Sequence, residues 1–136
     1  WKIISLRRHN ILRQAISDIV AKDRGAHHHR LSDGPLELDK MNIDCNKLIN
    51  VIKWFEKLSA QESKILENLP HLSIIYEDDL LKTEHHQKTL DRIFDYLGIP
   101  SVPVKTQFVK ITPNRLSDFV LNHKEIMQTI GEAEYV

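Results

Sequence analysis

Two short apolar runs alternate with longer helical patterns along the chain. The first run covers residues 1–6, and apolar residues then recur at positions 11, 12, 15, 16, 19 and 20. That spacing places the apolar side chains on one face of a helix. We therefore predict a buried strand over residues 1–6 and a helix from His9 or Asn10 to about Asp23, with Gly25 just past its end.

The next stretch repeats the same order of elements. An apolar stripe predicts a long helix that has Asp44 as its N-cap and that stops before Pro70. A β-branched run over residues 72–76 predicts a second strand, parallel to the first because the connection between them is helical. Trp54, beside Phe55 on the long helix, is expected in the core or in a seam between helices.

The remaining segments add helices and two irregular stretches. Residues 83–97 predict a helix with Thr83 as N-cap and Gly98 after its end. Residues 116–122 and 124–130 predict two short helices or one broken helix. Residues 26–42 and 101–115 lack periodicity and are expected to be loops. The whole pattern predicts a helix-rich α/β fold in which parallel strands are flanked by helices.

Composition narrows the class of protein. A chain of 136 residues predicts a single domain over residues 1–136, and 19 basic against 19 acidic residues disfavour broad nucleic-acid binding. No apolar run is long enough for a transmembrane helix, and no signal peptide is evident. The single Cys45 cannot form an internal disulfide, so a reducing, cytoplasmic setting is expected. The three consecutive histidines at 27–29 would converge poorly on one ion, so no metal is expected.

The candidate chemistry lies where the first strand meets its helix. Arg7 and Arg8 stand at the carboxyl end of the strand, and Ser17 lies about two turns into the helix. Ligands bind outside the carboxyl ends of strands in open α/β sheets, and helix N-termini favour anions. The arginine guanidinium can bind a phosphate through two parallel N–H hydrogen bonds. The arrangement predicts a phosphate site, with an ordinary surface arginine pair as the alternative.

The motif R-x-N-x-x-x-Q-A-x-S over residues 8–17 resembles the 3′-phosphate-binding segment of sulfotransferases that use 3′-phosphoadenylyl sulfate (PAPS). The resemblance implies that Arg8 and Ser17 hold the 3′-phosphate of the nucleotide. Ser17 follows Arg8 by nine positions, whereas many members show eight, so Arg7 is the alternative ligand. Residues 76–80, Tyr-Glu-Asp-Asp-Leu, resemble the Tyr-Glu-Asp-Leu segment that ends the corresponding strand, although carboxylates that cap the next helix would explain them equally well.

The resemblance also implies how the rest of the chain is used. A late basic loop folds over the nucleotide in this family, and Lys110 and Arg115 are the candidates here. The Arg-Lys-Gly triplet of the cytosolic branch is absent, which favours the bacterial or carbohydrate-type branches. The Gly/Ser/Thr-rich loop that holds the 5′-phosphosulfate is also absent. We therefore expect the C-terminal part of a P-loop-NTPase-like sulfotransferase domain, with a sheet edge that favours a homodimer.

Function is then expected to be sulfuryl transfer from PAPS to a hydroxyl acceptor, a carbohydrate or glycolipid, with adenosine 3′,5′-bisphosphate as product. The catalytic residues stay unassigned, and the chain alone is expected to lack part of the machinery. Two alternatives remain open. A non-catalytic helical interaction module would bind no nucleotide. A P-loop-like kinase fragment would need a Gly-Lys-Ser/Thr element, which the sequence does not contain.

Overall fold

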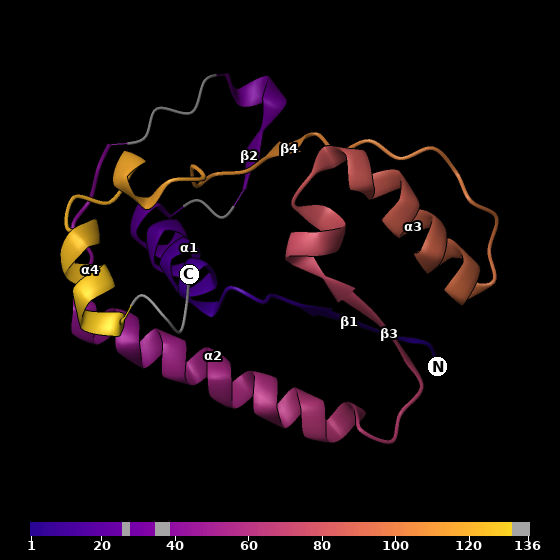
Figure 1. Cartoon of the computed structure of the whole chain (residues 1–136). Coiled ribbons are helices and arrows are strands. Elements are labelled where there is room, and N and C mark those ends of the chain that lie inside the picture. The colour runs from indigo at the N-terminus through magenta and orange to yellow at the C-terminus, as the bar shows by residue number, and fades with distance from the viewer. Residues whose placement is uncertain (26–27, 35–38, 132–136) are drawn as a thin grey trace. The chain divides into compact units, whose positions relative to one another are not determined.

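The computed structural model describes residues 1–25, 28–34 and 39–131. It is an α/β fold that is mostly helical and has a small parallel sheet, as the sequence predicts (Figure 1). The described elements in chain order are β1 (Ile3–Arg7), α1 (Ile11–Arg24), β2 (His29–Arg30), the 3-10 turn η1 (Leu31–Asp33), α2 (Cys45–Leu66), β3 (His71–Ile75), the π-helical turn η2 (Tyr76–Leu80), α3 (Thr83–Leu97), β4 (Phe108–Val109), the 3-10 turn η3 (Leu116–Asp118) and α4 (His123–Ile130).

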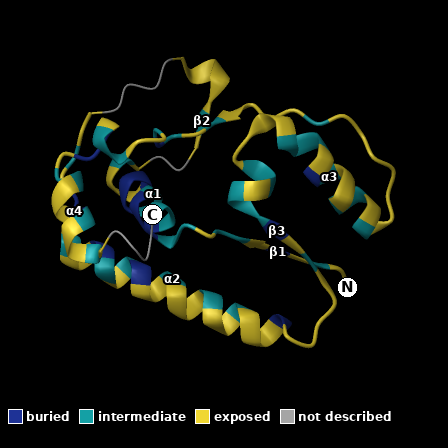
Figure 2. Ribbon diagram, viewed as in Figure 1, coloured by how far each residue is buried: buried dark blue, intermediate teal, exposed yellow. Residues whose placement is uncertain are grey.

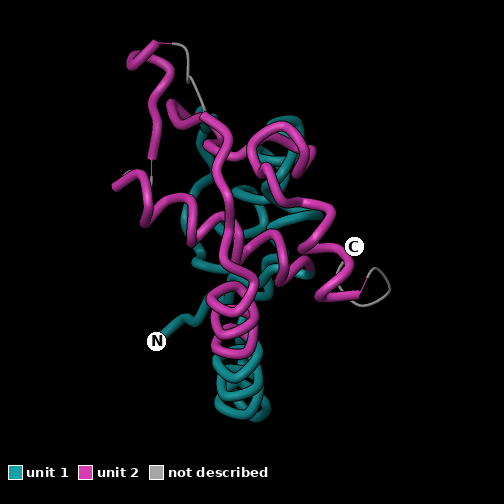
Figure 3. Tube along the Cα trace, turned by 90° about the vertical axis from the view of Figure 1, so that its left-hand side faces the viewer, with its two compact units in different colours: residues 1–9, 56–105 teal, residues 10–55, 106–136 magenta. Residues whose placement is uncertain are grey.

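The chain divides into two compact units, coloured separately in Figure 3. Unit 1 comprises Trp1–His9 and Glu56–Lys105, and unit 2 comprises Asn10–Phe55 and Thr106–Val136. Each unit is therefore assembled from two separate stretches of sequence, and α2 contributes one half to each. That both units belong to one domain stays a prediction.

Unit 1 contains the parallel sheet. β1 pairs with β3 from Ile3↔His71 to Arg7↔Ile75, so the predicted parallel pairing is confirmed. The prediction that β1 is a buried apolar strand is wrong: Ser5 is buried, whereas Ile4 and Leu6 are 40% and 56% exposed. Side chains alternate between the two faces of a strand, and the face that carries Ser5 meets α2 through a hydrogen bond to Glu62.

Unit 2 is built around α1. Its core contains Ile16 and Val20 of α1, Leu48 of α2, and Phe119, all fully buried (Figure 2). The predicted bounds of α1 are confirmed. The Asn10 side chain caps the first turn by accepting a hydrogen bond from the Arg13 backbone N–H at 2.8 Å.

The loops of unit 2 contain a strand pair that periodicity did not predict. β2 and β4 pair antiparallel, with His29 opposite Val109 and Arg30 opposite Phe108. The expectation of irregular loops is wrong at residues 29–30 and 108–109, because two-residue strands are too short to show a period. Further along, η3 and α4 are two separate helical segments, which was one of the two predicted alternatives, but η3 is a single 3-10 turn that ends at Asp118 rather than at residue 122.

The ends of α2 and α3 test the predicted caps. Asp44 accepts from the Lys47 backbone N–H at 2.9 Å, as predicted for an N-cap. Thr83 is not the N-cap of α3 but its first residue, and Lys82 takes the cap position without a side-chain bond. Gly98 ends α3 with φ 73°, a left-handed conformation that glycine adopts without strain.

Trp54 departs from the expected burial, since it is 52% exposed. Successive residues on a helix point about 100° apart. Phe55 packs against the core of unit 2, so its neighbour Trp54 is turned toward solvent. Among the described residues, none of the helices combines the length and apolar character needed to cross a membrane.

Candidate functional site

Arg8 and Glu77 meet at the carboxyl ends of the two parallel strands in unit 1. Arg8 directly follows β1, and Glu77 lies in η2, which directly follows β3. Parallel pairing brings both strand ends to the same edge of the sheet. Arg8 Nε donates to Glu77 Oε1 at 3.3 Å, and the guanidinium carbon lies 4.2 Å from the centre of the Tyr76 ring. This edge is where ligands bind in open α/β sheets.

The two oxygens of Glu77 bind two successive residues of the chain. Oε1 accepts from the Arg8 side chain, and Oε2 accepts from the His9 backbone N–H at 2.9 Å. Partial burial raises the pKa of Glu77, but hydrogen bonds from His9 and Arg8 outweigh it and leave the pKa below its ordinary value of 4.5. Glu77 is therefore ionised at neutral pH and holds Arg8 as a charged pair.

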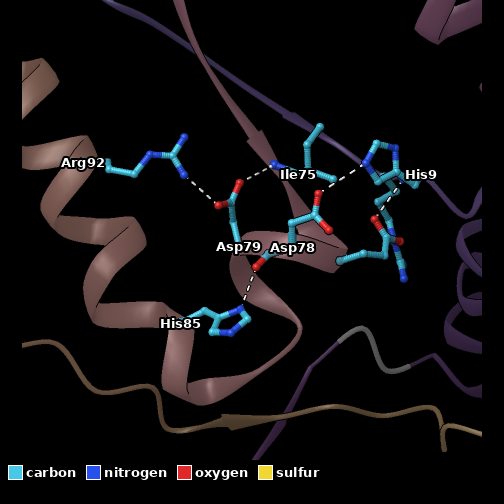
Figure 4. A network of polar contacts seen from close by, with 8 residues as sticks. His9, Ile75, Asp78, Asp79, His85 and Arg92 are labelled. Atoms are coloured by element: carbon cyan, nitrogen blue, oxygen red, sulfur yellow. Dashed lines mark hydrogen bonds and ion pairs between the residues drawn. The ribbon is translucent and has the colours of Figure 1, made fainter.

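The other two carboxylates of η2 bind in different directions, as Figure 4 shows. Asp79 accepts from the Ile75 backbone N–H at 2.8 Å and from Arg92 of α3 at 2.7 Å. Asp78 lies 3.4 Å from His9 Nε2. The idea that these carboxylates cap α3 is wrong, because its N-cap Lys82 has no side-chain bond. They bind Ile75 of β3, Arg92 of α3 and His9, which lies just beyond β1. Asp79 thus joins β3 to α3.

Arg7 has a different environment from its neighbour Arg8. Its Nε lies 3.6 Å from Glu62 Oε2 of α2, and Ser5 Oγ donates to the same carboxylate. The alternation of side chains along a strand accounts for the separation of the two arginines. Of the two predicted phosphate ligands, Arg8 therefore contacts Glu77 at the carboxyl ends of the two strands, and Arg7 faces α2.

In unit 2, Ser17 lies against the late loop. Its Oγ is 3.2 Å from Thr112 Oγ1, a hydroxyl of a buried residue that is 95 positions away in the sequence. One turn earlier on α1, Arg13 donates from Nη2 to the Pro113 carbonyl oxygen. Two successive turns of α1 thus hold the loop over residues 112–113, and this loop lies between the two predicted cations Lys110 and Arg115.

The predicted cations are both exposed. Lys110 Nζ donates to Asn114 Oδ1 at 2.8 Å, and Arg115 accepts from the Asp118 backbone N–H through its carbonyl oxygen. In unit 2, Ser17 therefore lies on a helix that contacts the loop carrying Lys110 and Arg115. Arg8 belongs to unit 1, so its convergence with Ser17 on one phosphate stays a prediction.

The histidine run has structural partners where it is described. His29 Nε2 lies 2.9 Å from the Gly34 carbonyl oxygen, and the His28 ring lies 5.4 Å from the Phe108 ring. His27 lies outside the described residues. Within residues 1–25, 28–34 and 39–131, no three metal-ligating side chains form a group.

Sequence reasoning missed Thr112, and no local signal could have found it. Its link to Ser17 joins segments at opposite ends of the chain, and a serine in one segment does not indicate which distant hydroxyl it contacts. The Tyr-Glu-Asp-Asp-Leu segment did signal Glu77. Comparison of the chain with protein-family models, curated proteins and solved structures finds no significant match.

Proposed function

We propose that this chain is the nucleotide-binding part of a PAPS-dependent sulfotransferase and that it holds the 3′-phosphate of the nucleotide. The observation that carries the proposal is the contact between Ser17 of α1 and Thr112 of the late basic loop. In the family that the sequence resembles, the helix serine and the late loop serve the same phosphate. Lys110 and Arg115 lie on this loop and supply positive charge.

Arg8 supports the same proposal from unit 1. It stands just beyond the carboxyl end of a strand in a parallel pair, the position at which open α/β sheets bind ligands. Its hydrogen bond to Glu77 uses only Nε, one of the five N–H groups of a guanidinium. The four N–H groups on Nη1 and Nη2 match the forked geometry that arginine uses for phosphate.

The proposed reaction transfers a sulfuryl group. An acceptor hydroxyl oxygen forms a bond to sulfur, the bond between sulfur and the 5′-phosphate oxygen breaks, and adenosine 3′,5′-bisphosphate leaves. The acceptor proton passes to a base, for which the chain offers no assigned residue. The described residues hold the nucleotide, and a carbohydrate or glycolipid is the proposed acceptor. A reducing, cytoplasmic compartment would suit the single Cys45.

Isothermal titration tests the proposal directly. The full chain is titrated with adenosine 3′,5′-bisphosphate, with 5′-AMP and with ATP. We expect the bisphosphate to bind most tightly, because only it carries a 3′-phosphate, and we expect Arg8→Ala to remove that preference. Equal binding of bisphosphate and 5′-AMP would refute a 3′-phosphate site. Preference for ATP would favour the kinase alternative.

A second candidate function is supported by the exposed surface of α2. In the half of α2 that belongs to unit 1, Leu58 and Ile65 are 40% and 67% exposed and lie two helical turns apart. Exposed apolar residues on one helix face are typical of surfaces that bind another protein. A helical interaction module would use this face and would bind none of the three nucleotides, so the same titration separates the two functions.

A further inference from the structure

We infer that Glu77 is a positioning residue that sets the orientation of the Arg8 guanidinium for a phosphate dianion. The inference rests on the proposed function and deepens it, because it names what gives the site its preference for a 3′-phosphate. Three features of unit 1 carry it: the division of the Glu77 oxygens between two residues, the Tyr76 ring beside the guanidinium, and the shielding of the pair from solvent.

The first feature fixes the backbone and the side chain together. Glu77 Oε2 holds the His9 backbone N–H at 2.9 Å, while Oε1 holds Arg8 Nε at 3.3 Å. One carboxylate from the end of β3 therefore sets both where the chain leaves β1 and where the arginine side chain points. A flexible arginine would otherwise lose much of its rotamer freedom only when the ligand binds.

The second feature restricts the remaining motion of the guanidinium. The Tyr76 ring, one residue before Glu77, lies 4.2 Å from the guanidinium carbon, a distance typical of a cation–π contact. Among the described residues, no carboxylate other than Glu77 pairs with Arg8. The Nε edge and one neighbouring surface of the guanidinium are thus occupied, and within the described part of the chain its Nη groups have no partner, which leaves them for a ligand.

The third feature is shielding. The side chains of Arg8 and Glu77 are 22% and 21% exposed, so water competes less for this pair than for a fully exposed one. The depressed pKa of Glu77 agrees with a carboxylate that its donors keep ionised. The same negative charge repels a phosphate, however. If the orientation of Arg8 dominates, removal of Glu77 weakens phosphate binding. If charge repulsion dominates, removal of Glu77 strengthens it.

Two substitutions separate orientation from charge. Glu77→Gln removes the charge and keeps one of the two acceptor oxygens, and Glu77→Ala removes the charge and both acceptors. Glu84→Ala serves as the matched control, because Glu84 is an exposed carboxylate of unit 1 that pairs only loosely with His85 at 3.8 Å. The three variants and the unaltered chain are titrated with adenosine 3′,5′-bisphosphate and with 5′-AMP, and the Arg8 Nε–H resonance is followed by NMR.

If Glu77 orients Arg8, Glu77→Ala weakens bisphosphate binding about tenfold or more and leaves 5′-AMP binding within about twofold. Glu77→Gln, whose one acceptor oxygen can still bind Arg8 Nε, loses less of the preference. The Arg8 Nε–H signal should be sharp in the unaltered chain and in Glu77→Gln, and broadened in Glu77→Ala. Glu84→Ala should change neither readout.

Several results would overturn the inference. Tighter bisphosphate binding by both Glu77 variants would show that repulsion dominates, and equal losses in both would show that charge rather than orientation matters. Unchanged binding by Glu77→Ala, in a chain that still prefers the bisphosphate, refutes the positioning role alone. An unaltered chain without that preference refutes the proposed function, and the positioning role with it.

Discussion

The hydroxyl of Ser17 offers the sharpest test of the 3′-phosphate site. In the structure its Oγ lies 3.2 Å from Thr112 Oγ1, and Thr112 is only 6% exposed. Ser17→Ala removes the hydroxyl and leaves the helix intact, since alanine is the best helix former. The substitution should therefore lower nucleotide affinity through a lost contact to the phosphate rather than through unfolding of α1.

The expected magnitude follows from the type of bond. A hydrogen bond to a charged group contributes about 1.5–3 kcal/mol. At about 1.4 kcal/mol per tenfold change, the dissociation constant for adenosine 3′,5′-bisphosphate should rise roughly 10- to 140-fold. In the free protein, Thr112 loses one hydrogen-bond partner, which should lower the free energy of unfolding by about 1 kcal/mol.

Thr112→Val is the matched control, because it breaks the same Ser17–Thr112 bond and keeps the Ser17 hydroxyl. We expect Thr112→Val to lower the free energy of unfolding by about 1 kcal/mol, as Ser17→Ala does, and to change the bisphosphate affinity by less than about threefold. Affinities are measured by titration at fixed salt, with 5′-AMP as the second ligand, and stabilities by urea denaturation.

Two results would refute the role of Ser17. If Ser17→Ala weakens 5′-AMP and the bisphosphate equally, the hydroxyl does not serve the 3′-phosphate. If Thr112→Val weakens the bisphosphate as much as Ser17→Ala does, the effect arises from the position of the loop and not from a contact between Ser17 and the ligand.

Two further predictions concern stability. Folding lowers the pKa of Glu77, so the stabilisation that its ionised carboxylate contributes is present above the ordinary pKa of 4.5 and is lost as the pH falls through the lowered pKa of the folded state. The difference in unfolding free energy between the unaltered chain and Glu77→Gln should therefore be largest at pH 7 and vanish in strong acid. A difference that grows toward low pH would contradict this sign. Phe119→Ala should cost about 3–5 kcal/mol in urea denaturation, because Phe119 is fully buried in the core of unit 2. A loss under about 1 kcal/mol would show that this core is not closely packed.

The elements that the sequence predicted correctly depend on neighbours within a few positions. Asn10 caps α1 through a residue three positions on, and Gly98 ends α3 with its own backbone conformation. The apolar spacing of α1 likewise identified its buried face, because a helix repeats every 3.6 residues whatever packs against it. The parallel pairing of β1 and β3 followed from the helical connection between them.

The tertiary structure decided which of these surfaces acquired partners. Ile4 and Leu6 were expected inside, yet the face of β1 that meets α2 carries Ser5. Trp54 was expected to pack, yet Phe55 took the core-facing position. The assignment of Arg8 to Glu77 and of Ser17 to Thr112 joins residues 69 and 95 positions apart. Local periodicity shows which residues share one face of a helix or strand. Whether that face is buried, and which hydrogen-bond partners it finds, depends on distant segments that only the folded chain brings into contact.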